Sequence, residues 1–540
     1  MRLLGILAAV AAALLVADVA QAAPRVPDPP MVLPGDASIA SVRADAGTWL
    51  VGGRPGAVTD RLARAAGARK VVEGGWVVPR ERARALAAAL RRAGRLTYAE
   101  PNRLSTLRQT PPRAVADDPL SVQVPWRDAA VDPALAPPPV SPDSPILALV
   151  DAKADVAHPE FTSGGNLVTL DGRAVEVDHG TATAAVAGAP VNGIGMVGVW
   201  PGMRMINVPL PAEEIRCTDS ARGIRRAVAS GAAVINMSYG STAFCQTEYL
   251  ALQEATRAGV TLVAAAGNEF DRGNPLEFPA SLPHVLTVGA STPDDQAAFF
   301  SNQNAAMDLV APGVSIIAAV PVALDTEDGT QDGYTLVDGT SFSAPMVAAA
   351  ATWLRQARPD LTVDQVAQVI RLSARDISTK GYDRSTGFGA LNLAAALQRT
   401  PPAADVQEPN DDIGFVDGRA FDAPTPAVFT KDRRADFRAL LDVYEDPADV
   451  YRLRVPPRRT VTVTIRPTFG NPDLALFSGS AQAVRQSRLR IARSRHSAQH
   501  TDTVRFRNST GRTRTVYARV WIRPASGLRT LDAGYRLTAR

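Results

Sequence analysis

The chain has 540 residues, of which 46% are hydrophobic and 21% are charged. This composition can bury large cores and excludes an intrinsically disordered protein, and the length favours several domains. The formal net charge is only +4, which excludes a dominant basic surface, so no nucleic-acid partner is expected.

The N-terminus has the three regions of a secretory signal peptide. Met1-Arg2 carries the positive charge, an apolar run extends from Leu3 to Val16, and Ala20-Gln21-Ala22 supplies the small residues of a cleavage site. We expect residues 1–22 to be removed and the protein to be secreted, to an extracellular or periplasmic location. A membrane anchor is the alternative, but the apolar run is short for a span, and no membrane association is expected after cleavage.

Residues 47–104 alternate short β-like runs with helical runs. Their order is strand, helix, strand, strand, helix, strand, which predicts a small α+β unit. A proline-rich region at 105–145 follows, with Pro137-Pro138-Pro139 at its centre. We expect this region to be a linker or an extended arm that lies on a neighbouring domain.

Residues 146–400 alternate apolar strand patterns with helical patterns. The strand patterns are Ile146–Val150, Met205–Leu210, Ala233–Met237, Val260–Ala265 and Val285–Gly289. Continuous apolar strands between helices predict a parallel sheet with helices on both faces, and functional residues then gather at the carboxyl ends of the strands.

The composition changes again after Pro401-Pro402. Short β-like segments such as Val450–Val455 and Val516–Ile522 are separated by turns rich in Gly, Pro, Asn and Ser. This pattern predicts a separate antiparallel β-sandwich at 401–540.

The chain has two cysteines, Cys217 and Cys245. Export would place them in an oxidising compartment, where a pair is usually bonded, so we expect one disulfide. A zinc or redox site is disfavoured because there is no CxxC spacing and no histidine close in sequence. No metal ligands are assigned.

Three polar residues stand at the ends of apolar elements in the α/β region. Asp151 follows the first strand, His179 opens a helix of small residues, and Ser341 precedes the alanine-rich helix at 346–354. An acid, an imidazole and a hydroxyl are the parts of a nucleophilic triad, in which Ser341 attacks, His179 transfers the proton and Asp151 holds the imidazole tautomer. Taken alone, Ser341 would be interpreted as a helix N-cap.

Asn268 follows the small residues Ala264-Ala265-Ala266-Gly267, which allow a substrate backbone to approach closely. Its side-chain amide can donate a hydrogen bond to an oxyanion that forms on the substrate. The free N–H groups and the dipole at the start of the helix near Ser341 can add to that stabilisation.

The order Asp151, His179, Ser341 and the sequences around these residues resemble the subtilisin-like serine proteases (subtilases, peptidase S8 family). The matching segments include LALVD, HGTATAAVAG, VINMSYG, AAAGNE, FPASLPHVLTVGAS, LVAPGVSI and GTSFSAP, within about Asp118 to Leu397. The resemblance implies a subtilisin-like three-layer α/β fold and a serine endopeptidase that cleaves protein or peptide substrates through an acyl-enzyme. Such an enzyme requires no organic cofactor, and we expect a monomer.

The flanking regions also resemble parts of such proteases. Residues 47–104, which end in AEPNRL, look like the inhibitory propeptide of the family, which implies a zymogen that processes itself and is inhibited by its own propeptide. Residues 401–540, with Glu408-Pro409-Asn410-Asp411, look like the β-sandwich often appended to secreted bacterial proteases. The competing interpretations are an inactive binding protein on the same fold, and a serine hydrolase or transpeptidase.

The resemblance assigns a primary specificity pocket. Its walls would be Ser238-Tyr239-Gly240 and Ala265-Ala266-Gly267, with Glu277 at the bottom. A carboxylate there attracts Lys or Arg and rejects acidic side chains. The alternative is that Glu277 turns out to solvent or pairs with Arg272. We expect the Cys217–Cys245 bond to tie the start of a helix to the loop after Val234–Gly240, the strand that the resemblance places along the substrate cleft.

The chain departs from the family after the triad aspartate. A small hydroxyl residue and a glycine are usual there, whereas this chain has Ala152-Lys153. The lost hydroxyl could remove a hydrogen bond, and Lys153 would put a cation beside the triad. We interpret the departure as a perturbation, because the triad and Asn268 are all present.

Three weaker features complete the sequence. The acidic loop at 325–333 offers oxygen ligands for calcium without EF-hand spacing, so a solvated hairpin turn is favoured and a structural calcium is unsupported. The arginines between 488 and 514 predict a solvated basic face, with an anionic cell-surface polymer as the alternative ligand. Four histidines lack partners at ligand spacing and are interpreted as structural: His158, His284, His496 and His500.

Overall fold

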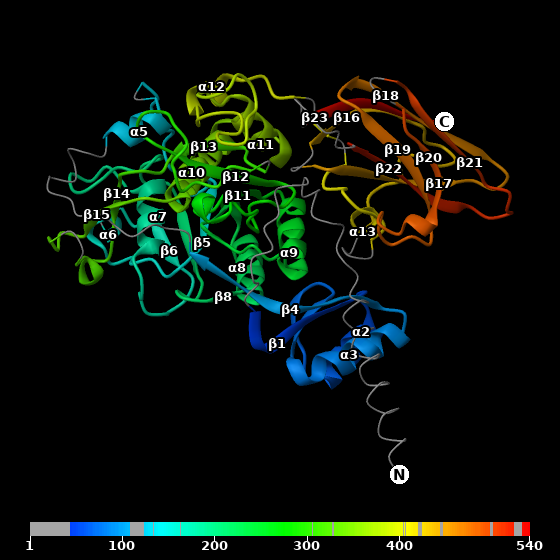
Figure 1. Cartoon of the computed structure of the whole chain (residues 1–540), viewed down its shortest axis with the longest axis horizontal. Helices are drawn as coiled ribbons and strands as arrows, with labels where there is room; N and C mark the ends of the chain where they lie inside the picture. Colours follow the sequence, from blue (N-terminus) through cyan, green and yellow to red (C-terminus); the bar gives the residue numbers. More distant parts are fainter. Residues whose placement is uncertain are drawn as a thin grey trace, which may run out of the picture.

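Figure 1 shows a small N-terminal unit, a central α/β body and a C-terminal region of antiparallel sheets. The computed structural model describes residues 44–540 except 108–123, 133, 163, 305, 327–328, 403, 406, 419–423, 443–445, 497–499 and 523–531. The predicted signal peptide lies outside the described residues. No helix in the described part of the chain combines the length and the apolar character that a membrane crossing needs.

The central body is built on a seven-stranded parallel sheet in the order β13-β12-β11-β9-β5-β7-β6. Its strands are β5 (Ile146–Asp151), β6 (Leu167–Thr169), β7 (Met205–Pro209), β9 (Ala232–Met237), β11 (Thr261–Ala265), β12 (Val285–Ser291) and β13 (Leu309–Pro312). The central strands are buried on both faces, as their continuous apolar runs predicted. The predicted parallel sheet is confirmed.

Helices cover both faces of this sheet. They are α7 (His179–Gly188), α8 (Cys217–Ala229), α9 (Gln246–Arg257), α10 (Thr340–Ala357), α11 (Val363–Leu372) and α12 (Leu393–Gln398), with the short α6 (Pro159–Thr162) nearby. Leu147 and Leu149 of β5 belong to the core with α7 and α10, and Ala148 and Val150 belong to the core with α8 and α9. Successive strand residues point to opposite faces, so one apolar run supplies both cores and the three-layer fold is confirmed.

The N-terminal unit has the predicted order of elements. They are β1 (Ala44–Gly53), α2 (Ala57–Ala65), β2 (Arg69–Val72), β3 (Gly75–Pro79), α3 (Arg80–Arg92) and β4 (Leu96–Leu107). Its strands pair antiparallel and α3 packs against β1 and β4. β4 then leaves the unit and enters the α/β body, where it pairs with β8 (Ile215–Arg216) and β10 (Tyr239–Gly240) (Figure 1).

The described part of the proline-rich region lies on the α/β body, which was the second of the two expected alternatives, but part of it is helical and not extended. It contains the helix α5 (Val124–Ala130), in which Pro125 occupies the first turn, where its missing N–H is not needed. Trp126, Ala130 and Val131 are buried in the core of the α/β body. The apolar spacing of these residues outweighed the proline-rich composition.

The C-terminal region contains two four-stranded antiparallel sheets, in the orders β16-β23-β18-β21 and β17-β22-β19-β20. The elements are α13 (Ile413–Val416), β16 (Ala435–Asp442), β17 (Ala448–Val455), β18 (Thr460–Phe469), β19 (Pro472–Ser478), β20 (Arg490–Ser494), β21 (Asp502–Arg507), β22 (Arg514–Ile522) and β23 (Asp532–Ala539). Residues of both sheets share one core, so the predicted β-sandwich is confirmed. The acidic loop at 325–333 connects the antiparallel strands β14 (Ile316–Ala319) and β15 (Tyr334–Val337).

Candidate active site

Asp151 and His179 meet at the carboxyl end of β5, where α7 begins. His179 Nδ1 lies 2.6 Å from Asp151 Oδ1, and both side chains are fully buried. The backbone N–H of Ala152 donates to the same Oδ1 at 2.6 Å, and the Thr183 hydroxyl lies 3.2 Å from Oδ2. A buried carboxylate is stable as an anion only when donors surround it, so these contacts hold Asp151 in place to orient the imidazole.

Thr183 is a contact of Asp151 that the sequence analysis missed. Its hydroxyl lies 3.2 Å from both Asp151 Oδ2 and the Gly180 carbonyl oxygen. Because residues four apart share one face of a helix, His179 and Thr183 are both presented to Asp151. This spacing was the available signal. Thr183 supplies a hydroxyl contact that the residue after the aspartate, Ala152, cannot make.

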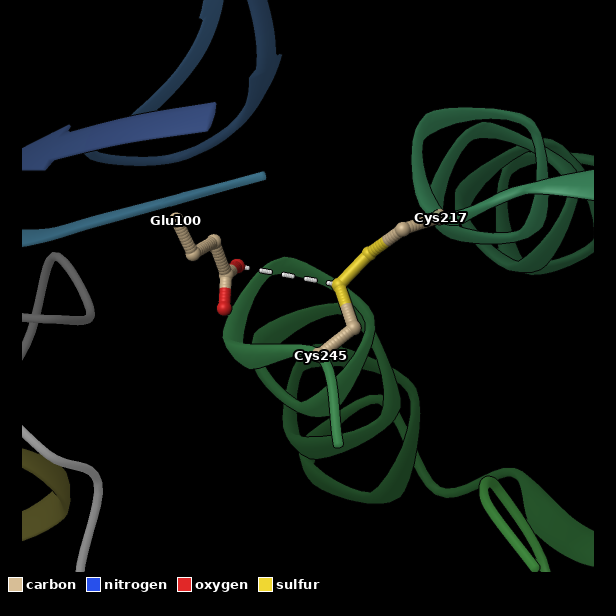
Figure 2. A group of neighbouring side chains, drawn as sticks. All are labelled: Glu100, Cys217 and Cys245. Carbon is tan, nitrogen blue, oxygen red and sulfur yellow. Dashed lines mark hydrogen bonds between the residues drawn. A yellow bond between two sulfur atoms is a disulfide. The ribbon is translucent and has the colours of Figure 1, made fainter. Parts of the chain in front are cut away.

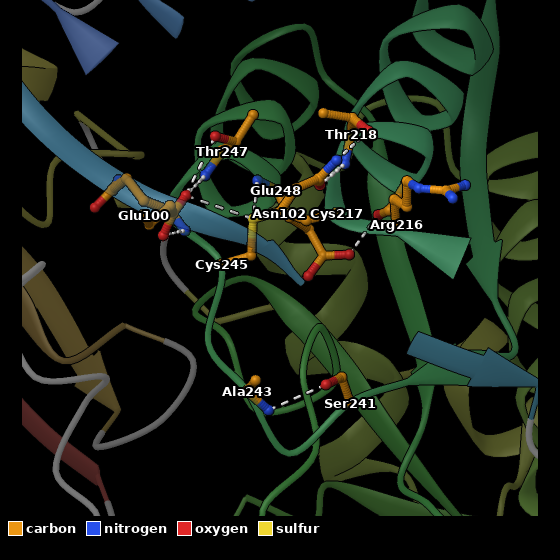
Figure 3. Close-up of a disulfide and its surroundings, with 12 residues drawn as sticks. Glu100, Asn102, Arg216, Cys217, Thr218, Ser241, Ala243, Cys245, Thr247 and Glu248 are labelled. Carbon is orange, nitrogen blue, oxygen red and sulfur yellow. Dashed lines mark hydrogen bonds between the residues drawn. A yellow bond between two sulfur atoms is a disulfide. The ribbon is translucent and has the colours of Figure 1, made fainter. Parts of the chain in front are cut away.

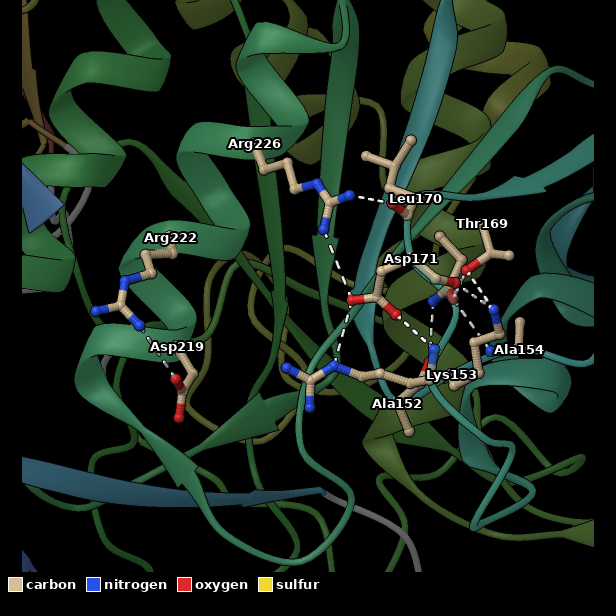
Figure 4. A network of polar contacts seen from close by, with 11 residues as sticks. Ala152, Lys153, Ala154, Thr169, Leu170, Asp171, Asp219, Arg222 and Arg226 are labelled. Atoms are coloured by element: carbon tan, nitrogen blue, oxygen red, sulfur yellow. Dashed lines mark hydrogen bonds and ion pairs between the residues drawn. The ribbon is translucent and has the colours of Figure 1, made fainter.

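Lys153 makes its hydrogen bonds at the end of β6. Its Nζ donates to Thr169 Oγ1 at 3.0 Å and to the Asp171 carbonyl oxygen at 2.7 Å, as Figure 4 shows. The Asp171 carboxylate beside it is paired in turn with Arg173 and Arg226. The ammonium group of Lys153 is therefore occupied by these oxygens, and no ion pair between it and Asp151 is found within the described residues.

Ser341 lies in the first turn of α10, whose N-cap is Gly339 at φ 151°, so Ser341 is not itself the N-cap. Ser341 Oγ donates to the Ser238 carbonyl oxygen at 3.3 Å, and Ser238 Oγ donates to the Ser341 carbonyl oxygen at 2.8 Å. The ring of the next residue, Phe342, has its centroid 5.9 Å from that of His179. The buried Nε2 of His179 has no hydrogen-bond partner among the described residues, so it can accept a proton.

Asn268 is oriented by Thr340. Its Oδ1 accepts from the Thr340 backbone N–H at 3.0 Å and from the Thr340 hydroxyl at 2.9 Å. A backbone N–H is always a donor, so the oxygen of the amide must face it and Nδ2 must face the other way. This Nδ2 is buried and has no acceptor in the described structure. Asn268 therefore has an amide donor available for an oxyanion.

A strand of the N-terminal unit already pairs with the chain that follows Ser238. Tyr239 and Gly240 of β10 pair antiparallel with Leu107 and Thr106 of β4. The two residues of β4 that come before Thr106 pair with β8. Tyr239 is itself fully buried, with its hydroxyl 2.7 Å from Ser220 Oγ. β8 and β10 therefore form two edges that can hold a polypeptide in extended form.

Glu277 lies against the wall that was assigned to the pocket. Gly267 has φ 104°, and a Cβ placed there would come 2.7 Å from Glu277 Cγ. Ala265 and Ala266 are buried in the same wall. Glu277 is only 1% exposed, whereas Arg272 is exposed, so the carboxylate is not turned out to solvent.

The expected disulfide is present, and it joins two helix N-termini. Cys217 opens α8 and Cys245 is the N-cap of α9 (Figure 2). Glu100 of β4 approaches the same place, with Oε1 3.7 Å from Cys245 Sγ. The bond therefore holds together two helices on which the N-terminal unit docks.

Two side chains of β4 cap these helices, as Figure 3 shows. Glu100 accepts from the backbone N–H groups of Gln246 and Thr247 at 3.1 and 3.2 Å, and Asn102 Oδ1 accepts from that of Thr218 at 3.0 Å. Burial raises the pKa of Glu100 to about 7, although the N–H donors oppose the shift. Because first-turn N–H groups have no acceptor within a helix, these caps complete α8 and α9.

His284 was interpreted as structural, and it lies among three carboxylates that the sequence analysis did not name. Its Nδ1 lies 3.3 Å from Asp364 Oδ1, and its Nε2 lies 3.1 Å from Asp411 Oδ2 and 3.5 Å from Glu408 Oε2. Burial opposes the positive charge, but Asp411 and Asp364 raise the pKa of His284 to about 10. The acidic Glu408-Pro409-Asn410-Asp411 was the available signal.

Comparisons with known proteins agree with this geometry. The model of the subtilase family matches residues 126–389. Subtilisin DY of Bacillus licheniformis is 30% identical over 259 residues, which are 47% of this chain and 90% of that protein. Alkaline elastase YaB of a Bacillus species is 33% identical over 222 residues, 41% of this chain, and the match spans only 55% of the elastase.

The fold is also similar to a solved structure. Fervidolysin from Fervidobacterium pennivorans, described as a keratinolytic enzyme related to subtilisin, matches with a TM-score of 0.56 and 18% identity over 86% of both chains. At that identity the likeness concerns the fold alone.

Proposed function

Because the chain belongs to the subtilase family, we propose that it is a secreted serine endopeptidase, made as a precursor that processes itself. The observation that carries the proposal is the buried contact of 2.6 Å between His179 Nδ1 and Asp151 Oδ1, next to the nucleophile's helix. Asn268 adds an available amide donor.

The proposed reaction follows from these contacts. Ser341 Oγ attacks the substrate carbonyl carbon while His179 Nε2 takes the hydroxyl proton, and Asp151 keeps the proton on Nδ1. The oxyanion is stabilised by Asn268 Nδ2 and by the backbone N–H of Ser341 in the first turn of α10. His179 then gives its proton to the leaving amine, and water hydrolyses the acyl-enzyme by the same steps in reverse.

Self-processing is supported by the place of β4. Leu107 pairs with Tyr239, so a chain that continued in this register would set its next residue opposite Ser238. Ser341 Oγ lies 3.3 Å from the Ser238 carbonyl oxygen. The peptide bond that follows the residue opposite Ser238 would therefore be the one that Ser341 attacks. The next residue in the sequence is Arg108, which lies outside the described residues. We therefore propose that the precursor is cut after Arg108 and that residues 47–104 then inhibit the enzyme.

A preference for basic residues is supported by Glu277. Its side chain is buried, and its Cγ lies against Gly267 in the wall of the proposed pocket. A buried anion there would attract Lys or Arg and repel acidic side chains. The same preference would suit cleavage after Arg108.

The catalytic proposal is tested with the parent protein and Ser341→Ala. Each is incubated with an unfolded protein substrate and with a fluorophosphonate probe. The parent is expected to cleave the substrate and to be labelled, and the variant to do neither. Ser343→Ala is the matched control, because its hydroxyl donates to the Pro312 carbonyl at 3.1 Å and it should stay active. Labelling of Ser341→Ala would remove Ser341 from its role.

The specificity proposal needs separate measurements. N-terminal sequencing of the mature protein is expected to begin at Gln109. Peptides that differ only at the residue before the scissile bond should show a preference for Arg or Lys, which Glu277→Gln abolishes and which the exposed control Asp271→Asn keeps. A preference for Phe or Leu that Glu277→Gln leaves unchanged would show that Glu277 does not set specificity.

A further inference from the structure

We propose that the junction between the α/β body and the β-sandwich binds one calcium ion through Asp405, Glu408, Asp446 and Asp449. Each residue offers a carboxylate oxygen, and these four oxygens lie within 4.8 Å of one another. Two oxygens on opposite sides of a calcium ion are roughly 4.6–5.2 Å apart, because each Ca–O distance is about 2.3–2.6 Å. The cluster therefore has the dimensions of one calcium coordination shell.

The buried oxygens of this cluster lack donors. Asp449 is fully buried; the Tyr535 hydroxyl donates to its Oδ2, and its Oδ1 has no hydrogen-bond partner among the described residues. Asp405 repeats the pattern, because the Leu440 backbone N–H donates to Oδ2 at 3.1 Å and Oδ1 is left without a partner in the described chain. In each case the protein holds one oxygen and leaves the other available for a ligand.

The other two members contribute in the same way. Glu408 Oε1 and Asp446 Oδ1 are buried and have no hydrogen-bond partner within the described residues. The side chain of Glu408 is only 3% exposed. A buried ionised carboxylate without a donor is strongly destabilising, and one that faces other carboxylates is more so. A divalent cation would remove both problems at once.

Neighbouring cations of the protein neutralise the cluster only in part. Among the described residues, no Lys or Arg is ion-paired with any of the four carboxylates, and His284 reaches only Glu408, at 3.5 Å. Both ring nitrogens of His284 are directed at carboxylates, since Nδ1 faces Asp364 and Nε2 faces Asp411. We therefore count His284 as the partner of Asp411 and not as a metal ligand.

The donor set favours calcium over softer metals. All four proposed ligands are carboxylate oxygens, which suit hard cations, whereas zinc and copper sites use sulfur or imidazole. A cavity lined by His284, Asp364, Asp405, Glu408 and Asp446 adjoins the cluster. Water in this cavity can complete the six to eight ligands that calcium takes.

The position of the site implies a structural role. Asp405 and Glu408 lie in the segment that follows α12, Asp446 lies just before β17, and Asp449 lies near the start of β17. An ion shared by these two segments would join the connection to the β-sandwich. His284 and Asp364 on the α/β body flank it, so the ion would order the junction between the two regions.

Calcium binding by the full-length Ser341→Ala protein, used to prevent any proteolysis of the sample by Ser341, tests the proposal. After treatment with a chelator, the protein is titrated with calcium by calorimetry. Asp449→Asn is expected to bind one ion fewer than its parent, or to bind that ion about 100-fold more weakly. The matched control Asp432→Asn, an exposed aspartate on the same sandwich, should bind the parent's number of ions.

Thermal unfolding provides the second measurement. Saturating calcium should raise the melting temperature of the sandwich by roughly 5–10 °C in the parent and less in Asp449→Asn. In the presence of chelator, Asp449→Asn should unfold at a temperature at least as high as that of the parent, because one of the repelling charges is removed. Such a melting temperature would also show that the variant folds. Asp446→Asn, whose residue is less buried, serves if Asp449→Asn does not fold.

Three results would overturn the proposal. The first is an equal number of calcium ions in the parent and in a folded Asp449→Asn or Asp446→Asn. The second is an equal calcium-dependent shift of the melting temperature in parent and variant. The third is a parent shift produced equally by magnesium at the same concentration, which would show that the site does not select calcium. None of these results depends on the catalytic proposal.

Discussion

The α/β body meets its two neighbours in opposite ways. At the N-terminal unit, β4 pairs with the strand β10 of the α/β body. Glu100 of β4 also accepts hydrogen bonds from two backbone N–H groups of α9. At the β-sandwich, the carboxylate oxygens of Glu408 and Asp449 face other carboxylates, and each residue has one oxygen without a donor among the described residues. A contact completed by protein groups can form and dissociate without an ion, whereas the proposed calcium ion would neutralise the cluster of buried carboxylates.

The junction with the β-sandwich does have a buried cation, but it is used elsewhere. Arg371 of α11 lies 2.8 Å from Asp442 of β16 and 3.6 Å from Asp308 of the α/β body. This pair shows how the protein neutralises a buried carboxylate when it supplies the partner itself. Under the proposed self-processing the N-terminal contact would be temporary, and the proposed calcium site would make the C-terminal contact permanent.

The largest effect is expected from His179→Ala, which should leave the N-terminal unit attached to the α/β body. His179→Ala should lower kcat by about 10⁶-fold and leave the precursor uncut, because no base remains for Ser341. Adding Ser341→Ala should cost little more, since the triad acts as a unit. Steady-state kinetics and the intact mass of the purified protein measure both results. Additive losses, or normal processing of His179→Ala, would contradict the assignment.

A smaller effect is expected from Glu100, which completes the N-terminal contact. Glu100→Ala in the isolated unit should weaken its inhibition of the mature enzyme roughly 5- to 30-fold, the usual range for a lost helix cap. Glu81→Ala, an exposed glutamate on α3, is the matched control. Chelator should not alter either inhibition constant. If Glu100→Ala inhibits as well as the parent unit, the cap does not hold the contact.

The same carboxylate predicts a pH dependence. Burial raises the pKa of Glu100 from 4.5 to about 7, so between these values the docked unit holds a proton that the free unit releases. Affinity should therefore fall as the pH rises from 4.5 to about 7, by at most about tenfold per pH unit, and then level off. Inhibition constants of the parent unit and Glu100→Gln test this, and the variant should lose this dependence.

The smallest expected effect concerns Asp151, a buried carboxylate that the protein supplies with donors. Thr183→Val removes one of them and should lower kcat roughly threefold to tenfold, with KM unchanged, because the imidazole is held less firmly. Thr183→Ser keeps a hydroxyl and should restore kcat. If Thr183→Ser is as impaired as Thr183→Val, the methyl group matters and the hydroxyl does not.

The sequence by itself determined the layers of the fold. An apolar strand such as β5 must be buried on both faces, and its alternating side chains supply two cores, so the parallel sheet and its covering helices follow from local pattern. The sequence also showed that Asp151 and His179 lie at the ends of elements. Because the chain has two cysteines, it also showed which residues could form the disulfide. The proline content predicted an extended segment where the helix α5 forms, because Trp126 and its apolar neighbours are buried in the core.

Only the tertiary structure decided which groups meet. Thr183 reaches Asp151 although 32 residues separate them, and His284 reaches Asp411 across 127 residues. The direction of Lys153, the orientation of the Asn268 amide and the burial of Glu277 were decided in the same way. Local periodicity records which face of an element is apolar, but it carries no information on which distant element will cover that face. The partners of buried polar groups are therefore set by packing, and spacing within one element, such as that of His179 and Thr183, shows only which residues share a face.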